Sequence, residues 1–140
     1  MNQYLEAAKE WFRYAEHDFC AAEHIAKTLL PTPHEIVCYH CQQAAEKYLK
    51  GFLVFQGDDP PHIHELAELC KLGKKYKPEF DEILIRCDTL SKYATQPRYP
   101  YEMPVDEAMM KLALYNISEV KKFMQKIIPE VFTEPEDTEP

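Results

Sequence analysis

The sequence predicts an all-α protein: an antiparallel up-and-down four-helix bundle with an additional short helix. Apolar residues recur at spacings of three and four along most of the chain, which is the periodicity of a helix with one buried face. No segment shows sustained alternation of apolar and polar residues, as a half-buried strand would. Only three of the 140 residues are glycine, too few for the many tight turns of an all-β fold.

The first two predicted helices are long and lie on either side of Pro31. The first runs from residue 4 to about 30, where Pro31 disfavours further helix. Its apolar stripe consists of Leu5, Ala8, Phe12, Ala15, Phe19, Ala22, Ala26 and Leu29. The second runs from about His34 to Phe55 and ends near Gly57.

Three further helices are predicted after the break at residues 57–61. A short one spans about His64 to Lys75, and a fourth spans about Pro78 to Ala94, with proline in its first turn. Residues 95–104 form a loop, and the last helix begins around Pro104 and runs to Ile128. The apolar stripe of this last helix is predicted as Met109, Leu112, Asn116, Val120, Phe123 and Ile127.

Length and charge predict one folded domain, residues 3–132, followed by an acidic disordered tail, residues 133–140. The tail carries four carboxylates and no basic residue, so the net charge of −8 becomes −4 for the folded part. An acidic domain lacks the basic footprint of broad nucleic-acid binding. This charge balance still permits a local basic pocket.

The lack of a recognisable signal peptide or membrane span and the pattern of cysteines predict a cytoplasmic protein. The first ten residues are polar and of mixed charge, unlike a signal peptide, and no apolar run is long enough to span a membrane. The five cysteines are an odd number scattered through helical segments, which favours reduced thiols.

The most informative segment is residues 42–50, which holds strong helix formers and neither glycine nor proline. Gln43, Lys47 and Lys50 stand at i, i+4 and i+7, so one helix face presents them together. Such a face could bind an anion or simply be solvated, and the pattern alone does not separate the two. Arg98, between Pro97 and Pro100, is equally open to a ligand-binding and a loop-packing interpretation.

Two polar residues, Asp18 and Asn116, stand on or beside apolar stripes. In the simpler interpretation, each side chain makes a buried hydrogen bond that sets the register of the helices. In the functional interpretation, it positions a ligand or a partner.

Metal and catalytic motifs are weak. His34, Cys38 and Cys41 share a helix face and could hold a soft divalent metal, but no second cysteine pair accompanies them. The sequence contains no serine in a glycine-flanked elbow, no Walker loop and no zinc-protease motif. We predict no metal, no cofactor and no catalytic residue, and the chain is more readily a binding protein than an enzyme.

Four motifs in order resemble a HEPN domain across roughly residues 3 to 130. They are Trp11 with Asp18, the run from Gln42 to Lys47, His64-Glu65-Leu66, and Arg98-Tyr99-Pro100. The resemblance implies a four-helix bundle, usually dimeric, often encoded beside a minimal nucleotidyltransferase in toxin–antitoxin-like or stress-related systems.

Many HEPN proteins are metal-independent ribonucleases with an arginine followed, after four to six residues, by a histidine. This chain departs from that pattern, because its last histidine is His64 and only three residues separate Arg13 from His17. The resemblance therefore favours a branch that binds nucleotides or serves as a companion subunit. An interaction subunit that only docks a nucleotidyltransferase is the alternative, and a ribonuclease using Arg13 and His17 is the third hypothesis.

Together with these residue patterns, the resemblance implies a homodimer that binds a nucleotide or another phosphate-bearing ligand. The predicted ligand-binding residues are Gln43, Lys47, Lys50, His64, Arg98 and Tyr99.

Overall fold

A computed structural model describes residues 2–95 and 104–133 of the chain. This part holds five α-helices, two short 3-10 helices and no strand, so the all-α prediction is confirmed. The α-helices are α1 (Leu5–Thr28), α2 (His34–Phe55), α3 (Leu66–Lys74), α4 (Leu84–Ser91) and α5 (Glu107–Ile127). In the described ranges, no helix is both long and apolar enough to cross a membrane.

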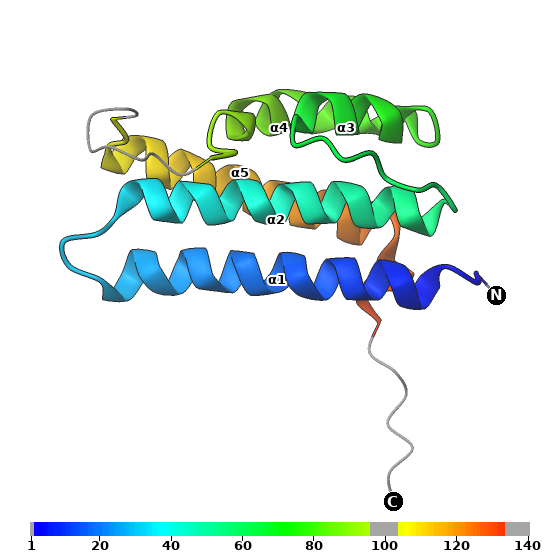
Figure 1. The fold of residues 1–140 in the computed structure, drawn as a ribbon, viewed down its shortest axis with the longest axis horizontal. Coiled ribbons are helices and arrows are strands. Elements are labelled where there is room, and N and C mark those ends of the chain that lie inside the picture. The colour runs from blue at the N-terminus through cyan, green and yellow to red at the C-terminus, as the bar shows by residue number, and fades with distance from the viewer. Residues whose placement is uncertain (1, 96–103, 134–140) are drawn as a thin grey trace, which may run out of the picture.

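Helix α2 lies at the centre of the arrangement (Figure 1). It runs antiparallel to α1 on one side, faces the layer of α3 and α4 on the other, and has α5 behind it. Thirteen of its 22 residues are buried, against five of the 24 in α1. A helix covered on so many sides must satisfy its polar side chains internally, because water reaches few of them.

The predicted fourth helix is divided in two, so the fold has three long helices and two short ones instead of four long and one short. A 3-10 helix, η1 (Pro78–Glu82), precedes α4, and Ile83 between them has φ −113° and ψ 2°. The break places the buried ring of Phe80 between Phe52 of α2, at 4.6 Å, and Phe123 of α5, at 5.0 Å. Periodicity alone could not reveal this change of helix type.

The buried face of α5 also differs from the predicted stripe. Leu112 is 50% exposed, and the neighbouring Ala113 is buried in its place. Leu112 and Ala113 are adjacent apolar residues, so the helical periodicity is compatible with two different buried faces of α5. Packing against α2 and α4 buries the face that contains Ala113. The buried residues are Met110, Ala113, Asn116, Ile117, Val120, Phe123 and Met124.

Gly51 allows α2 to approach α1 closely. A Cβ atom there would lie 2.6 Å from Cδ1 of Phe12 and 2.9 Å from Cβ of Trp11. The Phe12 ring is 3% exposed and packs edge-on against Tyr48 at 5.1 Å, so it has little room to move.

We expect Gly51→Ala to lower the free energy of unfolding by about 1–3 kcal/mol through overpacking. In a helix without a clash the same change adds about 0.5–1 kcal/mol of stability. Urea denaturation of the two proteins distinguishes these outcomes. A variant as stable as the parent, or more stable, would show that the helices do not depend on this close approach.

Candidate functional site

Glu46 of α2 is the centre of a buried polar network. Its side chain is 9% exposed and accepts hydrogen bonds from Nε2 of Gln42 at 3.1 Å and Nζ of Lys50 at 3.1 Å. Nδ1 of His64, in the segment before α3, lies 2.9 Å from the same carboxylate. Gln42 also donates to the backbone carbonyl of His64, at 3.3 Å. The network therefore fixes both the side chain and the backbone of residue 64.

This network joins three of the six predicted ligand residues. Lys50 and His64 contact Glu46 directly. Gln43 joins the network through Gln42, because its Nε2 donates to Oε1 of Gln42 at 2.7 Å. Lys50 is 6% exposed, whereas the side chain of His64 is 68% exposed. Lys50 therefore neutralises an internal carboxylate, and of the groups around Glu46 the imidazole is the one with most access to solvent.

The environment lowers the pKa of the Glu46 carboxyl. Burial is the largest single effect and raises the pKa, but it is outweighed by the hydrogen bonds from His64, Gln42 and Lys50 and by the charge of Lys50. The carboxyl is therefore ionised at neutral pH and can hold its donors in place.

Lys47 is directed toward another partner. Its ammonium contacts Oδ2 of Asp18 on α1, and Nδ1 of His40 lies 2.9 Å from Oδ1 of the same carboxylate. The Asp18 side chain is 13% exposed, while those of His40 and Lys47 are 26% and 28% exposed. Lys47 and Lys50 thus serve different carboxylates, and the single cationic face predicted from their spacing does not form.

An aromatic groove of about 280 Å³ opens beside Lys47. Glu10, Trp11 and Tyr14 of α1 form it together with the lysine side chain. The ring of Tyr14 is exposed, and the Trp11 side chain is partly buried against the core. An aromatic surface beside a lysine side chain suits a ligand with a planar ring and a negative group.

The two loop residues in the predicted ligand set, Arg98 and Tyr99, lie outside the described residues, as does the predicted tail from residue 134 onward.

Arg13 and His17, the residues of the ribonuclease hypothesis, line a separate groove of about 490 Å³ between α1 and α5. Both are exposed. Nε of Arg13 donates to Glu10 at 2.8 Å, and the His17 ring packs edge-on against Tyr14 at 5.7 Å. The pair thus shares a groove, with Lys121 of α5 on its opposite side.

The two cysteines of α2 lie in the core. Cys38 and Cys41 are fully buried, and desolvation raises the pKa of Cys38 to about 11 and that of Cys41 further. Both thiols are therefore protonated at neutral pH in this fold, and a metal would have to displace their protons in order to bind. Within the described ranges, no group of three or more histidine, cysteine or acidic side chains could hold a metal ion.

Sequence reasoning missed Glu46 as the centre of the site. Gln42, Glu46 and Lys50 follow one another at intervals of four, which places an amide, a carboxylate and an ammonium on one line of the helix. That spacing was the available signal. The involvement of His64, 18 residues away, required the tertiary fold.

The comparisons with known proteins support one family. The family model described as HEPN domain matches residues 8–128. No curated protein and no solved structure matches the chain.

We expect Glu46→Gln to lower the free energy of unfolding at neutral pH by about 3 kcal/mol, because it leaves the Lys50 ammonium buried without a carboxylate. The folded-state pKa of Glu46 lies below the ordinary value of 4.5. Its stabilising effect is therefore complete above that value and is lost as the pH falls through the folded-state pKa.

Urea unfolding at a series of pH values measures the loss of stability and its pH dependence. The difference in free energy of unfolding between the parent and Glu46→Gln should become smaller in acid. Glu68→Gln is the matched control, because Glu68 belongs to an exposed pair with Lys71. Equal losses in the two variants would contradict a special role for Glu46.

Proposed function

Because the chain belongs to the HEPN family, we propose that it is a non-catalytic HEPN subunit that binds a nucleotide or another phosphate-bearing ligand. We propose further that it works as a homodimer and as the companion of a minimal nucleotidyltransferase in a toxin–antitoxin-like or stress system. The observation that carries the ligand proposal is the aromatic groove of Trp11 and Tyr14, which the side chain of Lys47 helps to line.

In this proposal the ring of a nucleobase stacks on Tyr14 at the groove, and a phosphate meets Lys47. Stacking of a base on an aromatic side chain contributes about 1–3 kcal/mol and tolerates different bases. Gln43 lies one helical turn before Lys47 and offers its amide to the same ligand. Asp18 and His40 keep the lysine at the edge of the groove.

The remaining predicted residues take supporting or additional roles. Lys50 and His64 act through Glu46, which sets the shape of α2 and of the segment before α3. Arg98 and Tyr99 remain proposed ligand contacts.

We expect calorimetric titration with ATP or GTP to show binding that weakens about tenfold in Lys47→Ala, because a charge-assisted hydrogen bond to the ligand is lost. Tyr14→Ala should weaken binding through lost stacking, and Arg98→Ala tests the proposed loop contact. Lys111→Ala is the control, because it removes an equal charge from an exposed pair on α5. Absence of heat at millimolar nucleotide, or equal affinities in Lys47→Ala and Lys111→Ala, would refute the site.

A purely structural interaction subunit is the alternative, favoured by the pairing of Lys47 with Asp18 and of Lys50 with Glu46. In that case these side chains stabilise the fold, and the protein only docks a nucleotidyltransferase. Copurification with a nucleotidyltransferase encoded by a neighbouring gene, without nucleotide binding, would favour this alternative.

The ribonuclease hypothesis is tested separately. We expect the purified protein to leave RNA intact at high concentration, because Arg13 is paired with Glu10 and the spacing to His17 departs from the family pattern. RNA cleavage that His17→Ala abolishes would overturn this expectation.

A further inference from the structure

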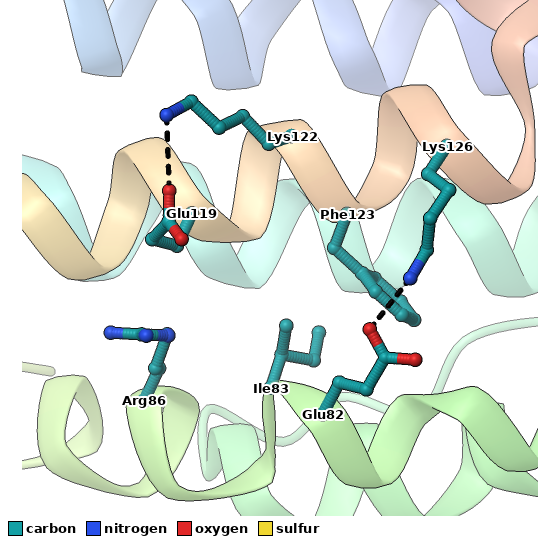
Figure 2. A pocket seen from close by; sticks show the side chains of 7 residues that line it. All are labelled: Glu82, Ile83, Arg86, Glu119, Lys122, Phe123 and Lys126. Atoms are coloured by element: carbon teal, nitrogen blue, oxygen red, sulfur yellow. Dashed lines mark hydrogen bonds and ion pairs between the residues drawn. The ribbon is translucent and has the colours of Figure 1, made fainter.

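A further pocket, of about 330 Å³, lies between η1–α4 and α5 and is lined mainly by charged side chains. Figure 2 shows Arg86, Ile83 and Glu82 on one side of it, facing the side chains of α5. The residues that line it are Glu82, Ile83, Arg86, Glu119, Lys122, Phe123 and Lys126.

Arg86 is held in place from two sides. Its Nη1 donates a hydrogen bond of 3.0 Å to Oδ1 of Asn116, which is only 3% exposed. Its guanidinium carbon lies 5.0 Å from the centre of the Tyr115 ring, within the range of a cation–π contact. A guanidinium oriented in this way loses little freedom on binding a ligand.

The charge of Arg86 is not matched by a carboxylate in the part of the chain that the structure describes, whereas Arg13 is paired with Glu10. The acidic groups of the pocket are engaged elsewhere. Glu82 pairs with Lys126 at 2.6 Å, and Glu119 pairs with Lys122 at 3.2 Å (Figure 2). One hydrogen bond to Asn116 leaves most of the five N–H donors of the guanidinium for a ligand.

We propose that this pocket binds a phosphate group, with Arg86 as its two-pronged donor and Asn116 and Tyr115 as positioning residues. A phosphate monoester carries about −1.5 to −2 charges and three strong acceptor oxygens, so it can occupy the arginine fork and still accept from a lysine. Lys122 adds a second positive charge to the pocket lining, with its exposed side chain paired to the partly buried Glu119 at 3.2 Å.

This site is separate from the groove at Lys47. Arg86 belongs to α4, which lies across α2 from α1, the helix that forms most of the Lys47 groove (Figure 1). The proposal therefore does not rest on nucleotide binding at Lys47. Free phosphate and a phosphorylated small molecule share the chemistry required here, so both inorganic phosphate and pyrophosphate serve as probes.

The test is calorimetric titration of the full chain with pyrophosphate and with inorganic phosphate. We expect Arg86→Lys, which keeps the charge but loses the fork, to weaken binding about tenfold. Lys122→Ala should also weaken binding, and its side chain is exposed enough that folding is unaffected. Lys111→Ala, the charge-matched control on α5, should bind as the parent does. Thermal unfolding of each variant confirms that it is folded.

Any of the following results would overturn the proposal. They are no binding of pyrophosphate to the parent at millimolar concentration, equal affinity in the parent and Arg86→Lys, an equal loss in Lys111→Ala, and acetate binding as tightly as phosphate. Loss of pyrophosphate binding in Lys47→Ala but not in Arg86→Lys would also overturn it, while leaving the groove at Lys47 supported.

Discussion

The buried carboxylate of Glu46 is the constraint around which the centre of this fold is arranged. Helix α2 is covered by α1, α5 and the α3–α4 layer, so its polar side chains have little access to water. An unpaired charge in such a place would be costly, and Lys50, Gln42 and His64 remove that cost by donating to Glu46. Among the described residues, no buried side-chain nitrogen or oxygen lacks a hydrogen-bond partner.

Other polar contacts extend the same principle across the helices. Glu16 of α1 accepts from the hydroxyl of Tyr48 on α2 and pairs with Lys121 of α5 at 2.9 Å. Asp18, also on α1, pairs with Lys47 of α2. These contacts set the relative register of three helices whose apolar faces alone would tolerate sliding, because apolar packing has little directional preference.

The ion pairs within the fold determine which cationic side chains can contact a ligand. Lys50 is buried beside Glu46, whereas Lys47 stands at the edge of an aromatic groove. Arg86 lines a pocket whose two carboxylates, Glu82 and Glu119, are paired with lysines. The two proposed sites belong to different helix pairs. Each combines a cation with a neighbouring aromatic ring, and in each a polar side chain, Asp18 or Asn116, fixes the cation before a ligand arrives.

Periodicity and proline placement by themselves determined the all-α class and the extents of α1 and α2, because long apolar stripes have few alternatives. They did not determine the break before α4 or the buried face of α5, where adjacent apolar residues fit more than one solution. The same limit applies to the site. Helical spacing placed Lys47 and Lys50 close together and put Glu46 one turn before Lys50, but only the tertiary structure brought Asp18 to Lys47 and His64 to Glu46. The partner of a long, flexible side chain depends on which group the fold brings within reach. Asp18 is distant in sequence from Lys47, and His64 from Glu46, so spacing along α2 could not identify either partner.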